Sequence, residues 1–172
     1  YADHALHGTV YPSHPSAVTT VGLNSTHLFA SSNYLVAIDI ASGAESWRQD
    51  TTVYPRALYV DDKRLVAEKW ELNLATGERI REFVGHEGIP RVVVHDAHLN
   101  ILATGASDDN VCVFDFETGE LLFAHWTGST VCSIAVHGKY LLLSCQSGSF
   151  LYTHHPEAER QTRVCVRTAD DY

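Results

Sequence analysis

Short apolar runs separated by small polar turns follow one another along the chain from about residue 17 to residue 167. The runs are rich in Val, Leu, Tyr, Thr and Phe, and several alternate apolar with polar positions, which is the period of a half-buried strand. Turn-forming pairs such as Asn24-Ser25, Asp61-Asp62 and Ser147-Gly148 separate them. No segment carries a sustained helical period with capping residues. The pattern therefore predicts an all-β protein: a sandwich, a barrel or a propeller.

A five-residue turn motif that recurs three times decides among these architectures. It occupies Asp39–Gly43, Asn73–Gly77 and Asp115–Gly119, and its glycines are 34 and 42 residues apart. In each copy the Asp or Asn accepts backbone N–H bonds and the Gly supplies a positive φ, which makes a tight hairpin. A period of about 40 residues with four strands per unit is typical of a β-propeller blade.

The repeats divide the chain into four such units. Two of them start their first strand with the same pair, Pro55-Arg56 and Pro90-Arg91. The predicted fold is therefore all-β, a partial β-propeller of four-stranded antiparallel blades that fills residues 1–172, with about four blades present. The blades run approximately over residues 13–52, 53–88, 89–128 and 129–168.

The third unit, with the residues just before it, resembles a WD repeat. His86 ends a Gly-His pair where that family has Gly-His, and Thr104 and Asp108 stand where it has its Ser or Thr and its tight-turn Asp. Phe114 replaces the Trp of Trp-Asp. In the family these four side chains form a buried hydrogen-bond network that pins a blade together. The resemblance implies a structural network of His86, Thr104 and Asp108, since Phe114 has no indole N–H to donate.

The same resemblance bears on the number of blades. WD-type propellers usually close with seven or eight blades, so about four blades imply part of a larger propeller. An open half-ring would leave an uncovered apolar blade face at each end. We expect the remainder to come from the same chain, another copy or a partner. The absence of Met from a chain that begins at Tyr1 likewise indicates a processed chain or a piece of a longer one.

Two other resemblances concern the remaining units. The terse hairpins at residues 60–65 and 136–141 are similar to those of F-box/WD-repeat proteins, which implies a substrate receptor of a ubiquitin ligase. The first unit also resembles the repeat of quinoprotein-type enzyme propellers, in which a turn ending in Gly leads to a Trp, here Trp47. The second unit lacks a tight polar turn, because residues 67–70 are too few to hold one.

Composition and charge narrow the class of partner. The 172 residues carry 12 Lys and Arg against 21 Asp and Glu, a formal charge of −9, which argues against nucleic acid and anionic membrane as partners. Hydrophobic residues make up 45%, enough for a core, and no apolar run is long enough for a membrane helix. The cysteines form no C-x-x-C pair, so we expect buried thiols in a reducing compartment, cytoplasmic or nuclear. They are Cys112, Cys132, Cys145 and Cys165.

Catalytic and metal-binding motifs are not found in the sequence. It has no Gly-x-Ser-x-Gly elbow, Walker loop or His-Glu-x-x-His, and its eleven histidines do not combine with Cys or carboxylates at ligand spacing. We therefore expect no cofactor. Trp47 and Trp126 are interpreted as packing between blades.

Arg56 and Arg91 are the candidate partner-binding residues. Both occupy the same position in their blades, at the start of the innermost strand, which in a propeller lies at the rim of the central channel. Two arginines there can hold a carboxylate or a phosphate in a bidentate manner, so an acidic or phosphorylated protein segment is the expected ligand. The sequence therefore predicts a non-catalytic protein–protein interaction scaffold within a larger assembly. The ubiquitin-ligase receptor and the quinoprotein-like enzyme stay as alternatives.

Overall fold

A computed structural model describes residues 17–50, 55–138, 140–153 and 162–166. All the regular structure in these ranges is β: four antiparallel sheets of four strands, each with its strands in chain order. Blade one consists of β1 (Thr20–Leu23), β2 (His27–Ser31), β3 (Tyr34–Asp39) and β4 (Glu45–Asp50). Blade two consists of β5 (Leu58–Val60), β6 (Leu65–Ala67), β7 (Trp70–Leu72) and β8 (Arg79–Glu82). Blade three consists of β9 (Pro90–Asp96), β10 (Ile101–Ala106), β11 (Asn110–Asp115) and β12 (Leu121–Trp126). Blade four consists of β13 (Val131–His137), β14 (Tyr140–Cys145), β15 (Gly148–Thr153) and β16 (Thr162–Val166).

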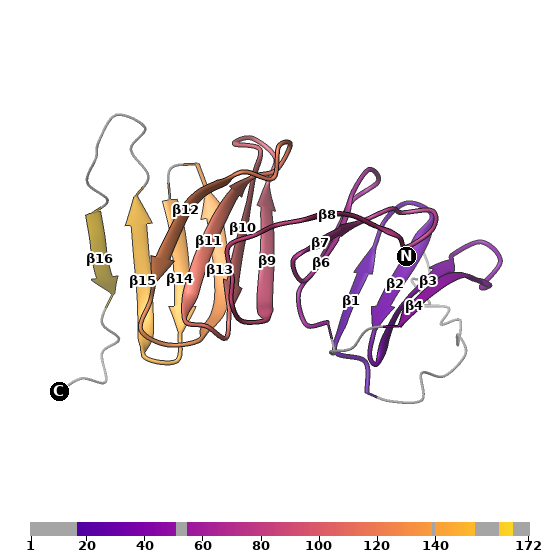
Figure 1. The fold of residues 1–172 in the computed structure, drawn as a ribbon, viewed down its shortest axis with the longest axis horizontal. Helices are drawn as coiled ribbons and strands as arrows, with labels where there is room; N and C mark the ends of the chain where they lie inside the picture. The colour runs from indigo at the N-terminus through magenta and orange to yellow at the C-terminus, as the bar shows by residue number, and fades with distance from the viewer. Residues whose placement is uncertain (1–16, 51–54, 139, 154–161, 167–172) are drawn as a thin grey trace, which may run out of the picture.

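The sheets follow one another as blades of a propeller. The first strand of each sheet contacts the first strand of the next: β1 meets β5, β5 meets β9, and β9 meets β13. Figure 1 shows the sheets side by side in chain order. The chain is therefore a partial β-propeller of about four blades. The expected divisions at 88/89 and 128/129 fall between sheets, whereas the expected limits at 13, 52, 53 and 168 lie outside the described residues. None of the described residues belongs to a helix long and apolar enough to cross a membrane.

The recurring turn motif has the predicted conformation in all three copies. The φ angles of Gly43, Gly77 and Gly119 are 71°, 75° and 77°, in the left-handed region. The Oδ1 atom of Asp115 accepts a hydrogen bond from the backbone N–H of Thr118 at 2.7 Å, which closes the β11–β12 hairpin. The positive φ explains the recurring glycine, because other residues adopt this conformation only with strain.

Apolar side chains fill the interfaces between successive blades. The interface of blades one and two holds Phe29, Trp47 and Leu65, all buried. The predicted packing role of Trp47 is thus confirmed. The same prediction for Trp126 is wrong: this residue ends the outer strand β12 and is 67% exposed.

The sequence predicts that all the cysteines are buried, and this prediction is wrong for one of them. Cys112 and Cys145 are buried, but Cys132 is exposed. Cys132 follows Val131, which packs against blade three, and therefore lies on the other face of β13. The side chain of Cys165 lies outside the described residues.

Blade two is built from shorter strands than its neighbours. β6 and β7 have 3 residues each, whereas β10 and β11 of blade three have 6 each. A turn of only two residues, Glu68 and Lys69, joins β6 to β7, and Glu68 takes the left-handed conformation with φ of 57°. The hairpin of blade two therefore stops short of the ends of the adjacent blades, which positions the site described next.

Candidate binding face

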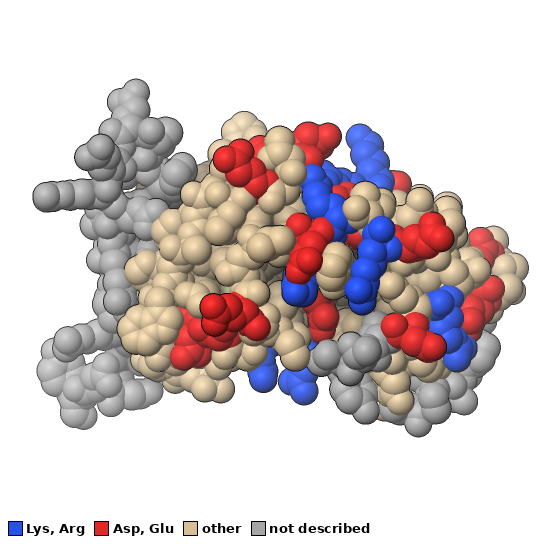
Figure 2. All heavy atoms as spheres, viewed as in Figure 1, with Lys and Arg blue, Asp and Glu red and all other residues tan. Residues whose placement is uncertain are grey.

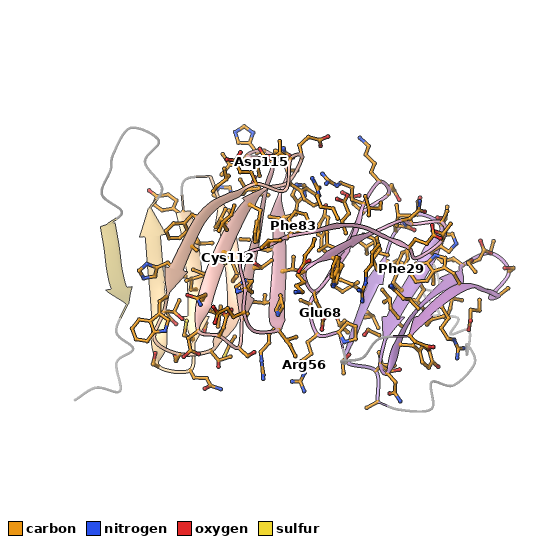
Figure 3. All side chains as sticks on the ribbon, viewed as in Figure 1. Phe29, Arg56, Glu68, Phe83, Cys112 and Asp115 are labelled. Carbon is orange, nitrogen blue, oxygen red and sulfur yellow. The ribbon has the colours of Figure 1, made fainter. Side chains whose placement is uncertain are left out.

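Arg56 and Arg91 are exposed at one edge of the propeller. Arg56 lies just before β5, and Arg91 is the second residue of the neighbouring strand β9. Figure 3 places Arg56 at the lower edge of the ribbon, where the connections into β5 and β9 lie. We call this edge of blades two and three the lower face. Among the described residues neither arginine has an ion-pair partner.

A hydrogen-bond network fixes the connection that leads to Arg91. Nδ1 of His86 lies 3.1 Å from Oδ2 of Asp108, and its Nε2 lies 2.8 Å from Oγ1 of Thr104. The same Asp108 carboxylate accepts hydrogen bonds from the backbone N–H groups of Glu87 and Gly88, at 2.8 and 3.0 Å. The structure thus brings together three of the four blade residues named from the sequence, and their contacts are structural ones.

Phe114, the fourth of these residues, is completely buried but lies outside the hydrogen bonds. Its ring centroid is 5.3 Å from that of Phe83, with the two rings nearly edge to face. The position that carries the indole in a WD repeat is therefore used for apolar packing between blades two and three.

The electrostatic balance of this network rests on Asp108. Burial alone would raise the pKa of its carboxyl group. Hydrogen bonds from the N–H groups of Gly88 and Asn110, together with the neighbouring His86, outweigh burial and hold the pKa below its ordinary value. The ionised carboxylate is therefore the form that the folded connection favours.

A hollow of about 330 Å³ lies where the short hairpin of blade two leaves space at the lower face. Residues of blade one, the β6–β7 turn and the connection before β9 surround it. Its apolar lining consists of Leu35, Pro55, Ala67, Leu72, Ile89 and Pro90. Its polar and aromatic lining consists of Gln49, Glu68, Lys69, Trp70, Arg79 and Glu87, with Gly88.

The charged side chains of the hollow differ in how many charge or hydrogen-bond partners they have. Nζ of Lys69 pairs with Oε1 of Glu82 at 2.6 Å, and the guanidinium of Arg79 lies 4.4 Å from the centre of the Trp70 ring. Oε1 of Glu68, in contrast, is buried and accepts no hydrogen bond from the described residues. Burial raises the pKa of Glu68, and the nearby charges of Lys69 and Arg79 only partly offset this.

The opposite edge of blades two and three carries an ion-pair cluster that the sequence did not reveal. Glu71 accepts hydrogen bonds from Nε of Arg64 at 2.7 Å and from a terminal nitrogen of Arg81 at 2.6 Å. Arg81 also donates to the backbone oxygens of Phe116 and Glu117, so the cluster joins the two blades. Figure 2 shows acidic and basic side chains gathered over this middle part of the molecule. Nε of Arg81 is buried and has no hydrogen-bond partner among the described residues, but the terminal nitrogens of Arg81 and the carboxylate of Glu71 are paired across the two blades, so the cluster is a structural clamp.

No described group of three His, Cys, Asp or Glu side chains is placed to hold a metal ion. His95, one of the histidines considered above, lies in an aromatic contact with Phe116, and its Nδ1 is 2.8 Å from the hydroxyl of Tyr59. Its surroundings are thus those of a packed residue between blades two and three.

Comparison with known proteins places this fold. No protein-family model matches the sequence, and no curated protein matches it significantly. Among solved structures, the computationally designed Ika4 protein matches 84% of this chain and 95% of its own, with 20% identity and a TM-score of 0.75. A chain of the mitotic checkpoint complex matches 88% of this chain, with 15% identity and a TM-score of 0.75. The RRP9 WD40 repeats match 90%, with 12% identity and a TM-score of 0.75.

These matches define the class of fold. The chain is a partial β-propeller with the fold of WD40-repeat proteins. It spans 52% of the checkpoint chain and 53% of the RRP9 chain, about half of each of these natural propellers. The predicted fold class is confirmed.

Proposed function

We propose that this chain is a non-catalytic protein-interaction module of a larger assembly, and that its lower face binds an acidic or phosphorylated segment of a partner. The observation that carries the proposal is the pair Arg56 and Arg91. Both are exposed, both lie at the entry to the first strand of a blade, and neither is neutralised by a described acidic residue. An arginine without an internal partner keeps its full hydrogen-bonding capacity for a carboxylate or phosphate.

The surroundings of the two arginines support a rigid site. The network of His86, Thr104 and Asp108 holds the connection before Arg91, and Pro55 and Pro90 are buried beside the two arginines. A preorganised face loses little conformational freedom on binding. The structural neighbours from the mitotic checkpoint complex and RRP9 have this fold, which is a supporting analogy only.

The test compares binding of defined peptides to three forms of the protein. Fluorescence anisotropy of labelled peptides carrying glutamate or phosphoserine would be measured for the wild type, for Arg56→Ala/Arg91→Ala and for Arg48→Ala. Arg48 is the matched control, because its guanidinium already pairs with Glu45 on blade one. We expect the double variant to bind at least 10-fold more weakly at unchanged melting temperature, and the control to bind as the wild type does. Equal binding by all three forms would contradict the proposal.

A narrower version of this function is the substrate receptor of a ubiquitin ligase. The exposed arginines favour it because phosphorylated segments are a common way to mark a substrate. Binding of phosphoserine peptides but not of glutamate peptides, together with co-purification of ligase subunits, would support it. The quinoprotein-like enzyme stays as the other alternative, and an absorbance spectrum of the purified protein that shows a bound quinone would support it.

We further propose that additional blades cover the outer face of blade four. Tyr140 and Leu142 on β14 are each 44% exposed, although Leu141 and Leu143 of the same strand are buried against blade three. At the other end, Val21 and Leu23 of β1 are each 62% exposed. The missing blades can belong to the same chain, another copy or a partner. A monodisperse 19.0 kDa species by light scattering that binds no dye for exposed apolar surface would contradict this proposal.

We propose a cytoplasmic or nuclear location, because Cys112 and Cys132 are free thiols and such compartments keep cysteines reduced. Microscopy of the tagged protein in cells tests this proposal.

A further inference from the structure

Glu68 combines three unfavourable features. It is a non-glycine residue in the left-handed conformation, at a turn position where Gly or Asn would be less strained. Its carboxylate is partly removed from water, and one of its oxygens is buried without a hydrogen bond among the described residues. Each feature disfavours the folded state, and their coincidence on one residue has no structural benefit that the fold displays. Strain and unsatisfied polar groups of this kind concentrate at binding sites.

The hollow around Glu68 has the form of a socket for one long side chain. Its apolar lining combines the buried Leu35, Pro55 and Leu72 with the exposed Ile89. Figure 3 shows Glu68 and Arg56 at the same end of blade two. A segment held by Arg56 would therefore pass next to the hollow.

The charges of the hollow favour a cation over an anion. Lys69 is neutralised by Glu82 at 2.6 Å, and the guanidinium of Arg79 is placed over the ring of Trp70. Glu68, Glu87 and Arg79 have no described ion-pair partner, so two carboxylates face one unpaired cation in the hollow. The unsatisfied oxygen of Glu68 requires a hydrogen-bond donor, and an ammonium or guanidinium group supplies both a donor and the opposite charge.

We propose that this hollow receives a lysine or arginine side chain of the partner, with its aliphatic stem against the apolar lining and its cationic group hydrogen-bonded to Glu68. The inference deepens the proposed function, on which it rests for the existence of a protein partner. On this proposal the lower face recognises both signs of charge: Arg56 and Arg91 bind an acidic residue of the partner, and Glu68 binds a basic one.

A first experiment separates a binding role of Glu68 from a structural role, because the two roles predict opposite changes in melting temperature. Glu68→Gln removes the charge, and Glu68→Asn also suits the left-handed turn. If Glu68 serves binding, both variants raise the melting temperature, because they remove a partly buried carboxylate with one unsatisfied oxygen. If Glu68 serves the fold, both lower it, and that result would overturn the proposal. Glu87→Gln is the matched control at the rim, and we expect it to leave the melting temperature unchanged.

The second experiment measures the site directly with a defined probe. The indole N–H signal of Trp70, assigned with Trp70→Phe, would be followed by NMR during titration with Nα-acetyl-lysine methylamide. The same compound with an acetylated ε-amine keeps the stem but loses the charge. We expect saturable shifts for the first compound, at least 10-fold weaker binding of the second, and a similar loss in Glu68→Gln. Equal binding of the two compounds, or no shift of the Trp70 signal, would refute the socket.

Failure of the site at Glu68 can be distinguished from failure of the proposed function. If acidic peptides bind through Arg56 and Arg91 but the lysine compound does not bind at Glu68, the proposed interaction module is supported and the lysine site is refuted. Arg79 could instead turn away from Trp70 in solution and pair with Glu68. The lysine compound would then shift the Trp70 signal in Arg79→Ala but not in the wild type, and that result also overturns the proposal.

Discussion

Nε1 of Trp47 donates a hydrogen bond to the backbone oxygen of Leu74, 2.8 Å away, across the interface of blades one and two. The bond links the outer strand of one blade to the turn motif of the next. The ring of Trp47 also lies against Gly77 of that motif: a Cβ atom on Gly77 would come within 2.6 Å of Cε3 of the indole. The glycine is therefore required twice, for its positive φ and for the approach of the ring.

Gly77→Ala should destabilise the protein by about 2–4 kcal/mol, from the left-handed backbone and from overpacking against Trp47. Gly138→Ala is the matched control, because Gly138 has a φ of 55° and no atom within 4 Å of the added Cβ. It should lose only the backbone part, about 1 kcal/mol. Denaturant unfolding measures both. Equal losses in the two variants would show that the contact with Trp47 is unimportant.

Trp47 and Gly77 also illustrate how much of this fold the sequence predicts. The turn motif and its spacing predict both the hairpins and the blade period, because a positive φ limits the choice of residue at the glycine. Trp47 was placed correctly in an interface, but Trp126 was not. A period of two identifies the two faces of a strand, yet it does not show whether an outer strand such as β12 has a neighbour on either face.

The lower face was predictable only in part. The echo of Pro55-Arg56 in Pro90-Arg91 points to equivalent positions, and the short stretch at 67–70 indicates a reduced turn. The hollow that results depends on residues of blade one and of the connection before β9, which no local pattern brings together. The clamp of Arg64, Glu71 and Arg81 is similarly non-local.

Glu71→Gln should destabilise the protein by about 3 kcal/mol, because it leaves the largely buried guanidinium of Arg81 without a counter-charge and that of Arg64 with only the exposed Glu117. The side chain of Glu71 is only 10% exposed. Glu117→Gln is the control: its carboxylate is 80% exposed and pairs with Arg64 at 3.4 Å, so its loss should cost less than about 0.5 kcal/mol. A similar loss in both variants would contradict the role of the clamp.

The same clamp predicts a dependence of stability on pH. Burial would raise the pKa of Glu71, but the hydrogen bonds and charges of Arg64 and Arg81 outweigh it, so its pKa in the folded protein lies below the ordinary value of 4.5. A lowered pKa contributes stability that is complete above the ordinary value and is lost as the pH falls through the lowered one. The difference in unfolding free energy between wild type and Glu71→Gln should therefore be constant near neutral pH and shrink in acid. A difference that grows in acid would have the wrong sign.

Thr104→Val should cost about 1–3 kcal/mol, because Nε2 of His86 loses its partner inside the protein. Amide hydrogen exchange offers a local readout: the N–H groups of Glu87 and Gly88, which bond to Asp108, should exchange faster as the network loosens. Thr118→Val, at an exposed turn position, is the control and should leave these two amides unchanged. Unaltered exchange at Glu87 and Gly88 in Thr104→Val would show that the connection before β9 is held by other contacts.

The three described cysteines should differ sharply in reactivity, because the thiolate is the nucleophile and it must also be reachable. Burial, assisted by the charge of Asp108, raises the pKa of Cys112 to about 12, so this thiol carries almost no thiolate at pH 8. Cys145 is buried as well, whereas Cys132 is exposed at the bulge of β13. Brief treatment with iodoacetamide followed by peptide mapping should therefore find Cys132 modified well before Cys112 or Cys145. In denaturant all three should react alike, and faster modification of Cys112 than of Cys132 in the folded protein would mean that the interface of blades two and three opens in solution.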